Sequence, residues 1–254
     1  MVSIPAAPPR RPGARLRRAR PVVAAAGVLG VLGLGGAAPP PPPPPVAAAA
    51  AVEIAVIGDS LSTGAMTPGD AWTDEALPML DRDGREVYFV NAAENGAGYV
   101  ARGSYGDTFA DEVDHVVSPR TRIVIVFGSD NDLGQPQVGQ AAIQTLSRVR
   151  ALAPSARVIV VGPPAPPAQS RSQLQPLSDA LHTAATAFAA SFVDALALRW
   201  FQSAASVYVG SDGEHPDRSG EAYLARNMAD IVQPVIARLT TAPARVQASG
   251  RRPG

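Results

Sequence analysis

The chain has 254 residues, 46% of them hydrophobic, which is enough for one α/β domain with a core and tails. It contains no cysteine and no lysine, which excludes disulfides, thiolate metal sites, a cysteine nucleophile, a Schiff-base lysine and a Walker-type phosphate loop. The formal net charge is zero, but six of the 22 arginines precede residue 21 and three follow residue 244, which leaves 13 arginines against 22 acidic residues between them. Because this central part is acidic, we expect no nucleic-acid partner.

Residues 1–51 have the composition of an export segment rather than of a fold. Six arginines precede an apolar stretch from Val22 to Leu34, and seven prolines from Pro39 to Pro45 follow it. This order is typical of a secretory signal peptide and a stiff spacer, so we expect a secreted or cell-surface protein. The apolar stretch is short and glycine-rich, which favours cleavage, so membrane contact is expected only through an uncleaved segment. We predict a folded domain over residues 52–240 and a disordered tail over 241–254.

From Val52 onward, strand and helix patterns alternate. Apolar runs predict strands at 52–57, 86–90, 122–127, 157–161 and 192–193. Helical periodicity predicts helices at 70–80, 107–117, 137–152, 172–190 and 219–239, with Asp70 as an N-cap and a kink at Pro234. Five such alternations imply a parallel sheet with helices on both faces and a site at the carboxyl ends of its strands.

Chemically useful residues follow these predicted strands. Ser60 follows the first strand, Gly96 the second and Asn131 the third, while Asp212 and His215 lie before the last helix. A serine that begins a helix has backbone N–H groups directed at whatever its hydroxyl attacks. The alternative for Ser60 is a simple helix cap without chemistry. We expect the preceding residue, Asp59, to hold the turn together by hydrogen bonds.

A serine nucleophile needs a base, and the chain offers three histidines. His115 falls in a charged helical pattern and is expected at the surface. His182 falls in an alanine-rich pattern and is expected at the surface or partly packed. His215 stands in a polar loop just before Pro216, although a turn histidine without function is the alternative. Asp212, three residues earlier, can reach the far nitrogen of His215, whereas the adjacent Glu214 points away from it.

Four short blocks carry a family resemblance. They are Gly58-Asp59-Ser60-Leu61, Asn91 with Gly96, Gly128-Ser129-Asp130-Asn131-Asp132, and Asp212-Gly213-Glu214-His215-Pro216. In this order they resemble the motifs of the GDSL or SGNH hydrolases. The resemblance implies a flavodoxin-like, three-layer α/β/α domain with a five-stranded parallel sheet, and ester hydrolysis through a serine acyl-enzyme. It also implies that Ser60 is the nucleophile, His215 the base and Asp212 its orienting acid, with Gly96, Asn131 and the Ser60 amide as oxyanion hole.

The third block departs from the family pattern, because one extra residue separates Gly128 from Asn131. Either the loop bulges and Asn131 still donates to the oxyanion, or Asp130 takes the asparagine position. A carboxylate beside a developing oxyanion would repel it, which favours Asn131.

The predicted function is therefore a secreted serine esterase that removes short acyl or acetyl groups from carbohydrate, lipid or cell-wall substrates. An acyltransferase of the same chemistry and a non-catalytic glycan-binding domain are the alternatives. No histidine or acidic cluster has metal-ligand spacing and no glycine-rich phosphate loop follows a strand, so we expect no metal and no cofactor. The expected partner is an ester substrate, bound by a monomer.

Overall fold

A computed structural model of the protein describes residues 51–81 and 86–241. The predicted signal peptide and spacer, and the predicted tail, lie outside the described residues except for residues 51 and 241, and they stay predictions. Within the described ranges, no helix has both the length and the apolar character needed to cross a membrane.

The centre of the domain is a parallel sheet of five strands in the order β2-β1-β3-β4-β5. The strands are β1 (Val52–Gly58), β2 (Val87–Asn91), β3 (Ile123–Phe127), β4 (Arg157–Val161) and β5 (Ser191–Val193). Every residue of β1 and β3 is buried, as expected for central strands covered on both faces. The predicted sheet and its five strands are confirmed, and the order is that of flavodoxin-like folds.

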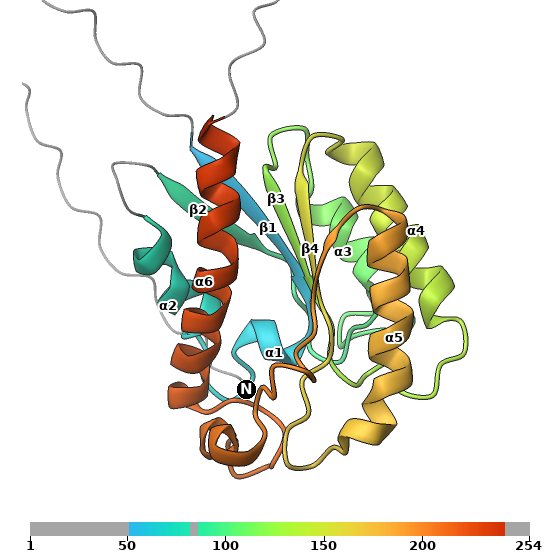
Figure 1. Cartoon of the computed structure of the whole chain (residues 1–254), viewed down its shortest axis with the longest axis vertical. Coiled ribbons are helices and arrows are strands. Elements are labelled where there is room, and N and C mark those ends of the chain that lie inside the picture. Colours follow the sequence, from blue (N-terminus) through green and yellow to red (C-terminus); the bar gives the residue numbers. More distant parts are fainter. Residues whose placement is uncertain (1–50, 82–85, 242–254) are drawn as a thin grey trace, which may run out of the picture. The chain divides into compact units, whose positions relative to one another are not determined.

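Helices cover both faces of the sheet (Figure 1). Successive strand residues point to opposite faces, so Val52, Ile54 and Val56 pack against one set of helices while Ala55 and Ile57 pack against the other. The first set is α1 (Ser60–Thr63), α2 (Trp72–Leu80) and α6 (Arg218–Thr241), and the second is α3 (Phe109–Val116), α4 (Val138–Leu152) and α5 (Arg171–Ala187). The domain is thus a three-layer α/β/α structure, as predicted.

The start of α2 differs from the prediction. Its N-cap is Ala71, and the prediction of Asp70 is wrong because the Asp70 carboxylate forms an ion pair with Arg218 of α6 instead. A backbone N–H of the first turn is hydrogen-bonded by a residue that is distant in sequence: the N–H of Trp72 donates to the carboxylate of Glu221 at 2.8 Å. The other helices begin and end within three residues of their predicted limits, and α6 continues through Pro234.

Glu221 supplies a prediction for stability. It is 1% exposed, and burial raises its pKa from 4.5 to about 7 against the bonds from Trp72 and Thr67. Between pH 4.5 and 7 the folded chain therefore keeps a proton on Glu221 that the unfolded chain has released. The contribution of Glu221 to the free energy of unfolding is full below pH 4.5 and is lost as the pH rises through 7. We expect the free energy of unfolding of Glu221→Gln, relative to wild type, to rise by up to about 3 kcal/mol between pH 4.5 and 7.5.

Urea unfolding at both pH values measures this difference. Asp230→Asn, at an exposed position of the same helix, is the control and should show no such trend. A difference between Glu221→Gln and wild type that stays constant with pH would contradict the expectation.

Candidate active site

Ser60 begins α1 directly after β1, where the chain leaves the sheet. The residue is 9% exposed, and α1 is a single turn of four residues. Asp59 is the N-cap, and its Oδ1 accepts a hydrogen bond from the backbone N–H of Leu61 at 2.9 Å. The prediction that Asp59 holds this turn together is confirmed. Because α1 is so short, charge stabilisation here depends on individual N–H groups rather than on a long helix dipole.

Asp59 also connects the first and third strands. It is fully buried, and burial raises its pKa to about 7 even though hydrogen bonds from Ser129 and Leu61 act in the opposite direction. The side-chain amide of Asn131 donates to Asp59 Oδ2 at 3.2 Å and to the backbone oxygen of Ala97 at 2.8 Å. Asn131 therefore contacts both the serine turn and the loop that carries Gly96.

His215 and Asp212 form a pair in the loop before α6. Nδ1 of His215 lies 2.8 Å from Asp212 Oδ2, while the backbone N–H groups of Glu214 and His215 both donate to Asp212 Oδ1 at 3.0 Å. Partial burial raises the pKa of Asp212, but these three bonds outweigh it and lower that pKa to about 2. A carboxylate ionised in this way keeps a proton on Nδ1 and leaves Nε2 free to accept one.

The remaining geometry brings the predicted residues to one place. A hollow of about 390 Å³ is lined by Ser60, Ala65, Asn95, Gly96, Asn131, Glu214 and His215. Asp130 borders a much smaller space beside Ser60 and His215, and its carboxylate accepts a hydrogen bond from the Gln169 side chain. Asn131 thus borders the larger hollow together with Gly96, whereas Asp130 borders the smaller space and bonds to Gln169.

Residues 56–223 match the model of the GDSL-like lipase/acylhydrolase family. The chain belongs to this family. The "GDSL lipase Rv0518" of Mycobacterium tuberculosis is 35% identical over 187 residues, which cover 70% of this chain and 80% of that protein. The four-block resemblance is therefore confirmed, and the chain is a carboxylic ester hydrolase.

Solved structures agree with this fold at low sequence identity. The esterase EstA from Pseudoalteromonas sp. is 14% identical, with a TM-score of 0.59 over 73% of this chain and 98% of that one. Est24 from Sinorhizobium meliloti, described as a carbohydrate acetylesterase, is 15% identical, with a TM-score of 0.52 over 72% and 99%. Identities this low support the shared fold alone.

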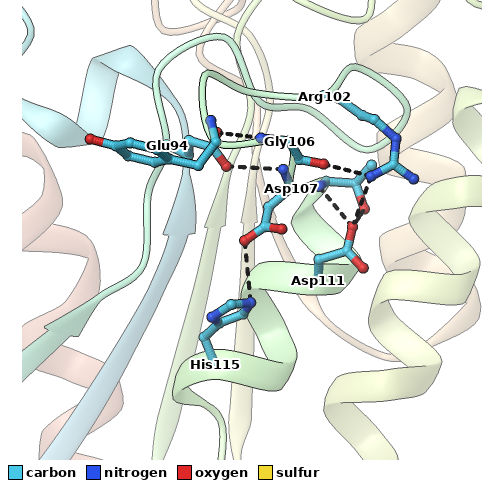
Figure 2. Close-up of polar contacts among 8 residues, drawn as sticks. Glu94, Arg102, Gly106, Asp107, Asp111 and His115 are labelled. Atoms are coloured by element: carbon cyan, nitrogen blue, oxygen red, sulfur yellow. Dashed lines mark hydrogen bonds and ion pairs between the residues drawn. The ribbon is translucent and has the colours of Figure 1, made fainter.

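Two buried carboxylates hold the GDSL domain's Gly96 loop, and the sequence did not single out either of them for this role. Glu94 accepts hydrogen bonds from three consecutive backbone N–H groups, those of Tyr105, Gly106 and Asp107. Figure 2 shows the bonds from Gly106 and Asp107. Asp132 does the same for residues 99–101, at 2.6 to 2.9 Å. A Cβ at Gly103 would lie 2.5 Å from the Glu94 carboxyl carbon, so this approach requires glycine.

The outer side of the same loop is joined to α3. Figure 2 shows Asp107 paired with His115, at 3.2 Å, and Arg102 directed at both the Gly106 oxygen and Asp111. His115 is therefore a half-exposed partner of Asp107, in agreement with its predicted surface position. His182 is also exposed and stacks on Phe192, with ring centroids 4.8 Å apart. Among the residues described, no three histidine or acidic side chains are grouped to hold a metal, and the expectation of no metal stays a prediction.

The irregular third block leads to a kinetic prediction. The side-chain amide nitrogen of Asn131 donates to Asp59 at 3.2 Å and to Ala97 at 2.8 Å. If Asn131 donates to the oxyanion, it does so with the N–H of the longer bond, the one to Asp59. We expect Asn131→Ala to lower kcat by roughly 10²- to 10³-fold with little change in KM, the loss typical of one oxyanion donor. Steady-state hydrolysis of p-nitrophenyl acetate measures it.

Asp130→Ala is the matched control at the neighbouring position and should change kcat by less than about tenfold, because Asp130 bonds to Gln169 and does not line the larger hollow. The opposite ranking of the two variants would assign the position to Asp130.

Proposed function

We propose that this protein is a secreted serine esterase that removes short acyl groups through a Ser60–His215–Asp212 acyl-enzyme mechanism. The observation that carries the proposal is the single hollow lined by Ser60, Gly96, Asn131 and His215, with His215 bonded to Asp212 behind it. Nucleophile, base and two oxyanion donors are the parts that acyl transfer needs, and they come from four separate segments of the chain.

The mechanism follows from these positions. Nε2 of His215 takes the proton of Ser60 Oγ as the oxygen attacks the ester carbonyl, and Asp212 stabilises the resulting imidazolium. The backbone N–H groups of Ser60 and Gly96 and the Asn131 amide then face the negative carbonyl oxygen. His215 returns the proton to the departing alcohol, and a water molecule, deprotonated by the same histidine, releases the carboxylic acid and regenerates Ser60.

The size of the hollow supports a short acyl group on a larger alcohol. A second candidate, a longer acyl chain, is favoured by a groove of about 610 Å³ whose lining includes Asp132, the residue after Asn131, and the apolar side chains of Leu133, Val138 and Leu177. It also agrees with the description of the Mycobacterium tuberculosis relative as a lipase. Comparing kcat/KM for p-nitrophenyl acetate, butyrate and octanoate distinguishes them, because only a short-acyl enzyme should prefer acetate.

The same assay separates the three classes of function. An esterase gives a burst of p-nitrophenol followed by steady turnover, and an acyltransferase gives much faster release when a sugar acceptor is added. A glycan-binding domain would bind oligosaccharide, measured by calorimetry, without any release above the blank. Turnover without an acceptor is the result that we expect.

Export can be tested on the expressed protein. Because the arginine-rich start, apolar stretch and proline spacer have the order of a signal, we expect the mature N-terminus in culture medium to lie between about Ala37 and Val52. N-terminal sequencing of the secreted protein measures it. Full-length protein retained in the cytoplasm would contradict the expectation.

A further inference from the structure

The backbone amide of Gly58, at the end of β1, is held from outside the sheet. Pairing between β1 and β2 ends at Val56 and Asn91, so strand β2 offers Gly58 no partner. The N–H of Gly58 instead donates to Oε2 of Glu112, on α3, at 2.8 Å. This single bond spans 54 residues of sequence and connects α3 to the turn that holds Ser60.

Gly58 is closely packed against neighbouring segments of the chain. A Cβ built on Gly58 would lie 2.9 Å from the Ser62 hydroxyl oxygen and 3.3 Å from the Phe127 backbone oxygen. Gly58 is thus enclosed by the next turn of chain and by β3, and it lies two residues before Ser60. A shift at Gly58 would therefore move Asp59 and Ser60 relative to the fixed Gly96 loop.

Glu112 has surroundings that suit a neutral carboxyl group. Its side chain is 1% exposed, and its second oxygen, Oε1, is buried without a hydrogen-bond partner. The charged groups that act on it most, Asp59, Glu94 and Asp107, are all acidic. Burial, followed by these charges, raises its pKa to about 9 despite the bond from Gly58.

Basic groups on the neighbouring elements face elsewhere. On α4, which packs against α3, Arg148 pairs with the exposed Asp114, and Arg150 donates to the Phe188 backbone oxygen. The acidic residue on β1, Glu53, lies at the opposite end of this strand from Gly58 and accepts a hydrogen bond from the Thr121 hydroxyl at 2.7 Å. On α3 itself, His115 pairs with Asp107.

We propose that Glu112 is a positioning residue for Ser60, whose neutral carboxyl holds the Gly58 amide and thereby the turn that presents the nucleophile. The inference rests on the proposed function of Ser60. Loss of the proton would place a buried negative charge beside this turn, where the reaction must develop negative charge on the substrate oxygen. The rate should therefore fall as Glu112 ionises, and a side chain that cannot ionise should remove that fall.

The test compares Glu112→Gln, which keeps an acceptor for Gly58 and is always neutral, with Glu112→Leu, which removes the acceptor. The matched control is Asp114→Asn, an exposed carboxylate of the same helix. The acetic acid released from p-nitrophenyl acetate is followed by pH-stat from pH 6 to 10, with Ser60→Ala supplying the blank rate.

We expect kcat of wild type and of Asp114→Asn to fall above about pH 9, roughly tenfold per pH unit. Glu112→Gln should keep kcat within about twofold of wild type at pH 7 and should show no such fall. Glu112→Leu should lower kcat at pH 7 by roughly 10- to 100-fold with KM within about twofold. Should Glu112→Leu fail to fold, the pH profile of Glu112→Gln decides alone.

Two results would overturn the proposal: an unchanged alkaline fall in Glu112→Gln, or a folded Glu112→Leu with wild-type kcat. Failure of the proposed function looks different, because wild type and Ser60→Ala would then hydrolyse the ester at the same rate.

Discussion

Ser60→Ala should lower kcat for p-nitrophenyl acetate by at least about 10⁴-fold, because it removes the atom that forms the acyl-enzyme. The remaining rate over water would come from the oxyanion donors at Gly96 and Asn131, which the change leaves in place. Steady-state kinetics measure it, and thermal unfolding should show a midpoint close to wild type, since Ser60 lines the hollow and the change removes one oxygen atom.

Ser62→Ala is the matched control, because Ser62 lies in the same helical turn but accepts a hydrogen bond from the Trp72 indole N–H at 3.1 Å. Its loss should reduce stability and leave kcat within about tenfold. Wild-type turnover in Ser60→Ala, or abolished turnover in a folded Ser62→Ala, would refute the assignment of Ser60.

Asp212→Asn should lower kcat by roughly 10³- to 10⁴-fold with a small change in KM. An asparagine can still accept the two backbone N–H groups through its oxygen, so the loop keeps its shape. Its amide N–H₂ would then face Nδ1 of His215, which selects the tautomer with the proton on Nε2. The histidine could no longer take the proton of Ser60.

Glu214→Gln is the control for Asp212→Asn, because Glu214 lines the hollow but His215 Nδ1 bonds to Asp212. We expect a change of less than about tenfold in kcat. A larger loss in Glu214→Gln than in Asp212→Asn would mean that Glu214 orients the histidine, contrary to the mechanism proposed here.

Local patterns were sufficient to predict the sheet and the residues at its carboxyl edge. The buried runs at Val52–Gly58 and Ile123–Phe127 are strongly β-branched, and the polar residues that follow them come together because parallel strands end at the same edge. The backbone contacts of the loop that carries His215 are local, but the position of this loop at the edge of the sheet depends on the whole domain. That position is predictable only through the family motif.

What could not be predicted depends on contacts between distant segments. Glu94, Glu112 and Glu221 look like ordinary surface acids in the sequence, yet each is buried and accepts N–H groups from another part of the chain. The 3₁₀ helix at Ser203–Tyr208 was also missed. Its first residue, Ser203, and the preceding Arg199 and Phe201 have positive φ angles of 54° to 60°.

The most direct test of Ser60 as the nucleophile is covalent labelling with a fluorophosphonate, followed by peptide mapping by mass spectrometry. We expect one adduct per chain on Ser60, formed more slowly in Asp212→Asn and absent in Ser60→Ala. An adduct on another residue, or hydrolysis of esters by a chain that forms no adduct, would contradict an acyl-enzyme at Ser60.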